Sequence, residues 1–499
     1  MATQAREDTV VRIESGALRG RSDGTVVAYR GVPYAAAPTG ARRFAPPAAP
    51  APWTGTLDAF ADGPVPPQNR SRLAHIMGDV DPPQGEDCLT LTIHAPAAPG
   101  TRRPVVVWLH GGAYLSGAGS LAWYSGRSFA ANGCVAVGVN YRLGALGFLY
   151  LPGVSDGNLG LLDQVAALRW VRANAAAFGG DPDNVTVIGQ SAGGHSIAAL
   201  MTMPAARGLF RRAILQSAPM GLPARAPDKA ARLGALYAEG LGVAAGDVSA
   251  LKTMPVAKLL EGQIALARRQ ARFADVTPPF LPVADGTNVP GDMMGALAAG
   301  AGKGIDIIVG TTREEMAAFY SIDKSVQEAD EAAVAKVFAD QLGADGPAHR
   351  RAYERMRASR KPFDIIGDLM TDRRFRAHSL RFAERQAALG HPAYVYQFDW
   401  PCPRFAACHC LEIPFMFDNL ADWPGSPMLA DADAGEMAAL AKAMHRAWVA
   451  FARSGDPNHD GLPPWRPYDA TRRTTMRFDR ISGPVDDLAG LGWRPAWPA

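Results

Sequence analysis

Residues 186–195 read Thr-Val-Ile-Gly-Gln-Ser-Ala-Gly-Gly-His, and this stretch decides the expected fold. It holds a G-x-S-x-G pentapeptide centred on Ser191, after a β-branched run and before an Ala-rich helical pattern. That order predicts a strand, a tight turn and a helix. A serine on such a turn is exposed in a strained conformation, and the flanking glycines let neighbouring backbone approach closely. The helix that follows aims its first amides at the atom that the serine attacks.

A second glycine turn follows an apolar run. Residues 104–110, P-V-V-V-W-L-H, predict a strand that is buried on both faces of a parallel sheet, and they lead directly to Gly111, Gly112 and Ala113. Small residues there let backbone N–H groups converge on an oxygen that becomes negative during acyl transfer. No Gly-Lys-Ser/Thr follows, which argues against a nucleotide-binding loop.

The order of the remaining segments predicts an α/β fold. Strands are expected at 134–140, 213–217, 305–310 and 393–400, with a helix at 158–178 and short antiparallel strands within 10–30. This order indicates a large, mixed, mostly parallel central sheet flanked by helices. Nothing reads as a linker, so 1–499 is predicted to be a single domain, with helical, cap-like insertions around 220–300 and 325–390.

Composition excludes several classes of protein. The chain has 499 residues, 48% hydrophobic and 20% charged, with a formal net charge of +3. That charge is too small to indicate nucleic acid or an anionic membrane as partner, and no apolar run is long enough to span a bilayer. Residues 1–15 lack the apolar region of a secretory signal. The odd number of cysteines, five, is not a disulfide framework, so a cytoplasmic, reduced protein is expected.

A nucleophilic serine needs a base, and the base needs an orienting acid. Glu314 and Glu315 follow the predicted strand at 305–310, and His409 follows the one at 393–400. The order serine, acid, histidine is typical of serine hydrolases built on such a sheet. His110 and His195 flank the serine turn but are expected to pack rather than react.

Two segments resemble metal sites only weakly. His409 lies among Cys402, Cys408 and Cys410, but no second C-x-x-C or paired histidine completes a set of four zinc ligands. Residues 431–436 resemble a calcium loop only loosely and lack its length. No metal is expected. The arginine-rich stretch at 373–385 is interpreted as a solvated helix face.

The chain resembles the type-B carboxylesterase and cholinesterase family, and is most similar to bacterial members of the para-nitrobenzyl esterase kind. The resemblance covers nearly the whole chain and implies an α/β-hydrolase fold. It rests on motifs that occur in one order, which are Gly31–Tyr34, Arg43–Phe44, Glu86–Leu89, His110–Ala113, Asn140–Arg142, Phe178–Pro182, Ser191–Gly194, Asp285–Gly286, Gly310–Glu315, His409–Phe417 and Phe451–Pro457.

This resemblance implies the roles of the site residues. Ser191 is expected to be the nucleophile and His409 the general base and then the acid. Glu315 is expected to orient the imidazole, because the family's acid is the second of the acidic pair. The family has a glycine next, where this chain has Met316, and this departure keeps Glu314 as an alternative.

Around the triad, the resemblance assigns supporting groups. The oxyanion hole is expected to be the N–H groups of Gly112, Ala113 and Ala192. Gly111, Gln190 and Ser217 are expected beside them, and Ser217 resembles the family serine that braces the acid. The family's secreted members pair the cysteine of Glu86-Asp87-Cys88 with an earlier one that is missing here, so five free thiols are predicted.

The expected function is that of a serine carboxylesterase that hydrolyses neutral carboxylic esters through an acyl-enzyme. It would use no cofactor, take small-molecule esters, and be a monomer or weak homodimer. Many relatives have glutamate where this chain has Gln190, and no Trp, Tyr or Phe lies between Gln68 and Glu86, so choline esters should have no advantage. The alternatives are an amidase or carbamate hydrolase using the same triad, and a non-catalytic, esterase-like binding protein.

Overall fold

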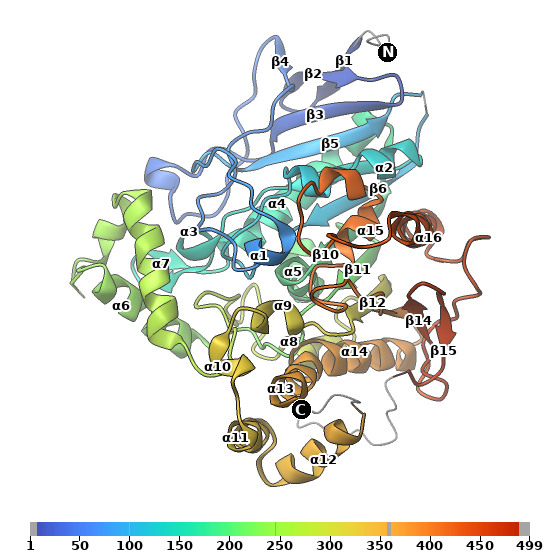
Figure 1. The fold of residues 1–499 in the computed structure, drawn as a ribbon. Helices are drawn as coiled ribbons and strands as arrows, with labels where there is room; N and C mark the ends of the chain where they lie inside the picture. Colours follow the sequence, from blue (N-terminus) through green and yellow to red (C-terminus); the bar gives the residue numbers. More distant parts are fainter. Residues whose placement is uncertain (1–6, 99, 245, 357–360, 489–499) are drawn as a thin grey trace.

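The computed structural model describes residues 7–98, 100–244, 246–356 and 361–488, and a 13-stranded sheet runs through it (Figure 1). A separate two-stranded sheet pairs β8 with β9. The strands are β1 Glu7–Ile13, β2 Gly16–Ser22, β3 Val26–Pro33, β4 Thr56–Asp58, β5 Thr90–Pro96, β6 Arg103–Leu109, β7 Val135–Val139, β8 Tyr150–Leu151, β9 Ser155–Asp156, β10 Gly180–Gln190, β11 Arg212–Gln216, β12 Asp306–Thr312, β13 Ala393–Phe398, β14 Thr475–Phe478 and β15 Gly483–Val485.

The middle of the large sheet is parallel and both of its flanks are antiparallel. From β7 the order is β6, β10, β11, β12, β13 and β14, and every neighbouring pair in this run is parallel. Strands β1, β2, β3, β5 and β7 pair antiparallel on one side, and β15 closes the other side. This arrangement confirms the predicted mixed, mostly parallel sheet.

Helices cover both faces of the sheet, and the alternation of side chains along the strands explains why. In β6, Val105 and Val107 join the core cluster that holds α4 and α5, whereas Val106 and Trp108 join the cluster that holds α16. A central strand must therefore be apolar throughout, because successive residues point to opposite faces. The helix α16, which the sequence did not predict, completes the second face.

The α-helices are α1 Ala74–Met77, α2 Arg127–Ala131, α3 Gly144–Phe148, α4 Leu159–Asn174, α5 Ala192–Thr202, α6 Pro227–Gly240, α7 Val256–Gln270, α8 Met293–Ala298, α9 Ala317–Tyr320, α10 Lys324–Gln327, α11 Glu331–Leu342, α12 Gly346–Met356, α13 Pro362–Thr371, α14 Ala377–Ala388, α15 Ile413–Phe417 and α16 Ala434–Ser454. The short 3-10 helices are η1 Gly40–Arg42, η2 Ala122–Tyr124, η3 Ala175–Phe178, η4 Pro204–Ala206, η5 Val248–Lys252, η6 Gly343–Asp345 and η8 Leu420–Asp422, and η7 Asp372–Arg376 is a π-helix. No described helix has the length and apolar composition needed to cross a bilayer.

The prediction for 373–385 is wrong in its first half. Residues 372–376 form the π-helix η7, and the Arg374 side chain there is 7% exposed and donates to Asp275 Oδ1 at 2.5 Å. The sequence pattern suggested a solvated face because it could not reveal the partner, which lies 99 residues earlier. The stretch at 431–436 is explained by a helix cap, since the Asp433 side chain accepts from the Glu436 N–H at the start of α16.

Candidate active site

Ser191 lies between β10 and α5, where the sheet strand turns sharply into the helix. Its φ of 54° and ψ of −122° put a non-glycine residue in a strained region of backbone space. The Ser191 N–H donates to Gln216 O at 2.9 Å, which fixes the turn against the end of β11. The serine therefore sits at the carboxyl edge of the parallel sheet.

The glycines of the pentapeptide are required by close approach. A Cβ on Gly189 would lie 2.5 Å from the Gly193 carbonyl carbon, and a Cβ on Gly193 would lie 1.9 Å from Leu109 O. No side chain fits at either distance, so the turn packs backbone against backbone. This packing brings the serine turn against the end of β6 and the glycine loop that follows.

That loop lies directly beside the serine. A Cβ on Gly111 would fall 2.9 Å from Ser191 Cβ, and φ is positive at Gly112, Ala113 and Tyr114. Among the described residues, the amides of Gly112, Ala113 and Ala192 donate to no protein acceptor. Three unused N–H groups thus lie in the two segments that meet at Ser191.

The loops after β12 and β13 bring a carboxylate and an imidazole together. Glu315 Oε2 and His409 Nδ1 are 2.5 Å apart, and the two side chains are 0% and 1% exposed. The other oxygen of Glu315 accepts from the Thr312 N–H at 2.8 Å. A buried carboxylate held in this way fixes both the orientation of the ring and the position of its proton, which the short contact places on Nδ1.

Glu314 contacts the backbone of the histidine loop and not the imidazole. Its carboxylate accepts from the Ala407 N–H at 3.1 Å and lies 3.2 Å from Arg313 Nε, while its backbone bridges to Cys408. Glu314 therefore ties the histidine loop to the end of β12 and leaves the imidazole to Glu315.

Gln190 is buried and its amide nitrogen lies 3.3 Å from His409 Nε2, on the ring edge opposite Glu315. The rings of Phe319 and Phe375 flank the imidazole, with centroids at 5.2 and 5.3 Å. The imidazole is thus enclosed by two phenylalanines, one amide and one carboxylate.

Ser217 does not brace Glu315, contrary to expectation. Its hydroxyl donates to Glu412 Oε1 at 3.0 Å, and Oε2 of Glu412 has no hydrogen-bond partner among the described residues. Burial raises the pKa of Glu412 to about 7, and the charge of Glu315 adds to this, while His409 and the Ser217 hydrogen bond oppose it. A second carboxyl group therefore lies behind the histidine.

No role for Glu412 was predicted from the sequence. The available signal was an acid three residues after His409, a spacing that one helical turn brings back to the same side. The two neighbouring histidines pack, as expected. His195 lies between the Tyr114 hydroxyl and Leu222 O, His110 stacks on Tyr141 with centroids 4.3 Å apart, and burial lowers the pKa of each histidine to about 4.

The five cysteines, all within the described residues, are buried free thiols, as predicted. Cys402 and Cys408 are hydrogen-bonded to each other beside His409. Across the described part of the chain, no group of three or more His, Cys, Asp or Glu side chains is placed to hold a metal ion.

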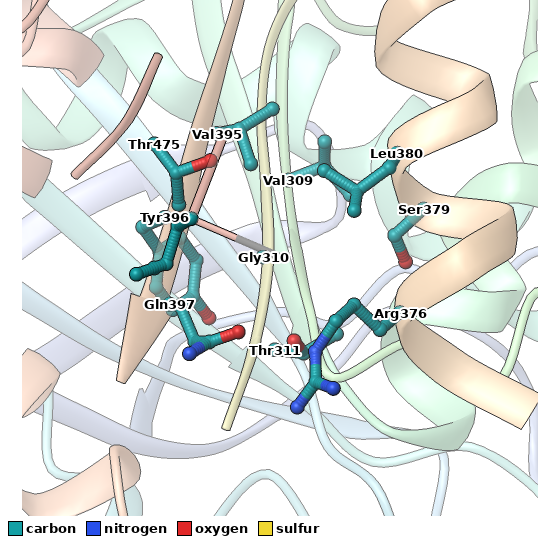
Figure 2. Close-up of a pocket in the computed structure, with 11 residues that line it drawn as sticks. Val309, Gly310, Thr311, Arg376, Ser379, Leu380, Val395, Tyr396, Gln397 and Thr475 are labelled. Carbon is teal, nitrogen blue, oxygen red and sulfur yellow. The ribbon is translucent and has the colours of Figure 1, made fainter. Parts of the chain in front are cut away.

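A small cavity lies between β12, β13 and α14, and Ser191 is not among the residues that line it (Figure 2). It is lined by Gly310, Arg376, Ser379 and Tyr396 among others, and its volume is about 20 Å³. Room of that size holds about one water molecule. It is too small to bind an ester, so the groups around Ser191 are the better candidate site.

Comparison with known proteins identifies the family of this chain. Residues 7–487 match the model of the Carboxylesterase family. The phenmedipham hydrolase of Pseudarthrobacter oxydans is 39% identical over 92% of this chain and 93% of its own length. The para-nitrobenzyl esterase of Bacillus subtilis (strain 168) is 38% identical over 94% of each chain.

A solved carboxylesterase from Geobacillus stearothermophilus superposes with a TM-score of 0.88 and 39% identity, covering 98% of this chain and 100% of its own. Each of these matches spans almost the whole molecule. The chain therefore belongs to the carboxylesterase family and is a carboxylic ester hydrolase with an α/β-hydrolase fold.

Proposed function

We propose that Ser191, His409 and Glu315 form the catalytic triad of this carboxylesterase. The buried contact of 2.5 Å between His409 Nδ1 and Glu315 Oε2 carries the proposal. With its proton on Nδ1, the imidazole presents Nε2 as an acceptor for the serine hydroxyl proton. Glu315 stabilises the imidazolium that forms after this transfer.

The N–H groups of Gly112, Ala113 and Ala192 are proposed to form the oxyanion hole. The support is that these amides have no acceptor among the described residues and belong to two segments that meet at the serine. Donors fixed in place before reaction stabilise the negative oxygen without reorganising. Removing a single donor of this kind typically lowers kcat by a factor of about 10²–10³.

The reaction then has two halves. The Ser191 oxygen attacks the ester carbonyl, the tetrahedral intermediate collapses, and His409 gives its new proton to the departing alcohol. Water then enters, His409 takes one of its protons, and the same steps release the acid and restore the serine. The triad needs no metal or organic cofactor for these steps.

The proposed substrates are neutral, short to medium acyl or aryl esters. Gln190 offers an uncharged amide beside His409, and there is no Trp, Tyr or Phe between Gln68 and Glu86 to hold a quaternary ammonium group. A cation–π contact contributes on the order of 0.5–2 kcal/mol, so a choline ester lacks this gain here. Butyrylthiocholine should therefore have no higher kcat/KM than a neutral thioester with the same acyl chain, and a preference of roughly tenfold or more would contradict this.

We also propose a single catalytic unit over 1–499, with insertions around 220–300 and 325–390, acting as a monomer or weak homodimer in the cytoplasm. The five free, buried thiols support a reducing compartment. Size-exclusion chromatography with light scattering measures the oligomeric state directly.

The direct test of function compares Ser191→Ala with Ser249→Ala, an exposed serine in η5. On 4-nitrophenyl butyrate, Ser191→Ala should lower kcat by several orders of magnitude and the control should match the wild type. Full residual activity in Ser191→Ala would end the proposal. A panel of matched esters, anilides and carbamates then decides which bond the enzyme cleaves best.

A further inference from the structure

Arg72, in the loop before α1, lies close to the proposed triad. Its guanidinium carbon is 6.0 Å from the centre of the Phe319 ring, and that ring is 5.2 Å from the His409 ring. The guanidinium is therefore at most about 11 Å from the imidazole, which is roughly one Debye length at 0.1 M salt. At that distance the charge is only partly screened from the imidazole.

The Arg72 side chain is exposed to solvent and also crowded by protein. Its hydrogen bond within the described residues is from Nη1 to Val276 O at 3.1 Å. Desolvation by the surrounding protein lowers the pKa of Arg72, the nearby Arg374 lowers it further, and Asp275 acts in the opposite direction. The guanidinium is therefore held by a backbone carbonyl and an aromatic ring while the side chain stays open to solvent.

A second cation supports the same site. Arg374 is 7% exposed and donates to Asp275 at 2.5 Å, yet its Nε has no partner among the described residues. It belongs to η7, the π-helix whose next residue, Phe375, packs on His409. Insertions of this kind are frequent at functional sites.

The charges of Arg72, Arg374 and Asp275 do not cancel. Asp275 pairs with Arg374 and also attracts the more distant guanidinium of Arg72, so one carboxylate faces two positive charges close to Phe319 and Phe375. Guanidinium binds carboxylate through paired N–H donors, and Arg72 retains donors that face solvent. The available chemistry is therefore that of an anion subsite.

We propose that Arg72, supported by Arg374, binds a carboxylate carried on the part of the ester remote from the scissile bond. The inference rests on the proposed triad and extends its substrates from neutral esters to acidic ones. A second interpretation is that Arg72 only packs on Phe319 and holds the ring in place. The two interpretations differ in which substrates respond to a change at Arg72.

Two matched substrate pairs test the proposal. One is the 4-nitrophenyl ester of octanoic acid against the 4-nitrophenyl monoester of octanedioic acid. The other is the acetate of 4-propylphenol against the acetate of 3-(4-hydroxyphenyl)propanoic acid. In at least one pair the acidic ester should have the higher kcat/KM by about fivefold, mainly through KM, which is the size expected for an exposed charge.

Variants of Arg72 then locate the effect. Arg72→Gln should remove most of the preference for the acidic ester, Arg72→Lys should keep most of it, and Arg72→Glu should reverse it. Arg70→Gln is the matched control, because Arg70 belongs to the same loop and pairs with Asp79 on the surface. Raising salt from roughly 20 mM to roughly 500 mM should weaken the wild-type preference, because the interaction is screened.

The outcomes distinguish a failure of the carboxylate subsite from a failure of the proposed triad. If the wild type hydrolyses the neutral esters but prefers neither acidic partner, the subsite is wrong and the triad stands. An unchanged preference in folded Arg72→Gln also overturns the subsite. If the wild type hydrolyses none of the four esters, the proposed function itself fails.

Discussion

The turn that carries Ser191 and the loops that carry Glu315 and His409 meet at one edge of the sheet, but different contacts hold them. At the serine, backbone packs on backbone, and a Cβ on Gly193 would come within 1.9 Å of Leu109 O. At the histidine, long side chains meet across 94 residues of sequence, and two buried carboxyl groups surround one ring. The first region tolerates no added atom, whereas the second depends on charge.

The largest effect is expected from Gly193→Ala, which disrupts the backbone packing at the serine turn. The added methyl group must displace backbone, so the free energy of unfolding should fall by about 3 kcal/mol or more and activity should be lost with it. Gly240→Ala is the control, since no atom lies within 4 Å of its Cβ position in α6. Urea unfolding of both variants measures the difference, and a Gly193→Ala enzyme as stable as the control would contradict the packing argument.

In the second region, activity should depend on the charge of the Glu315 side chain and not on its size. Glu315→Gln leaves the size of the side chain unchanged but removes its charge. If the amide oxygen accepts from the Thr312 N–H, the NH2 group faces Nδ1 and favours the wrong tautomer, so kcat should fall by about 10³–10⁴. Glu314→Gln should cost less than about tenfold, because Glu314 holds the loop. Steady-state kinetics on one ester compares them, and equal losses would show that the acid is misassigned.

Glu412 sharpens the comparison because its effect depends on pH. Below about pH 4.5 the carboxyl is protonated in both folded and unfolded chains, and between about 4.5 and 7 only the folded chain keeps the proton. Stability should therefore decrease as pH rises through this window, by roughly 3 kcal/mol for a shift of this size.

Glu412→Gln cannot ionise, so its stability relative to the wild type should improve from pH 4.5 to pH 8. Urea unfolding at several pH values measures this difference. A constant difference across that range would mean that Glu412 is already ionised in the folded enzyme, with its charge compensated by its neighbours.

The smallest effect concerns the thiols. Titration under denaturing conditions without reductant should count five thiols, and mild reductant should leave activity unchanged, because no described cysteine is in a disulfide. A count of three would point to Cys402 and Cys408, whose side chains already touch.

The first region could be predicted from the sequence because short, local patterns determine its backbone conformation. Glycines at fixed offsets around Ser191 and after His110 indicate that two backbone segments pack closely there. The β-branched runs before them indicate the strands that lead to these turns. The strand β6, for example, begins and ends within one residue of its predicted bounds.

The second region was predicted less completely because its contacts are non-local. The sequence predicted Glu315 and His409, which the structure brings into contact, but the resemblance paired Ser217 with the wrong carboxylate. The sequence pattern also gave Glu412 no role and predicted a solvated Arg374. Each miss concerns the partner of a polar side chain, and such partners lie 99 or more residues away. Local patterns carry no information about them.

The central claim is that Ser191 is the nucleophile activated by the buried His409–Glu315 pair. Incubation with a fluorophosphonate, followed by intact mass measurement and peptide mapping, tests it most directly. We predict one adduct per chain on the peptide that contains Ser191, no adduct in Ser191→Ala, and much slower labelling of Glu315→Gln than of Glu314→Gln. An adduct on another residue, or an active enzyme that takes up no probe, would contradict the account.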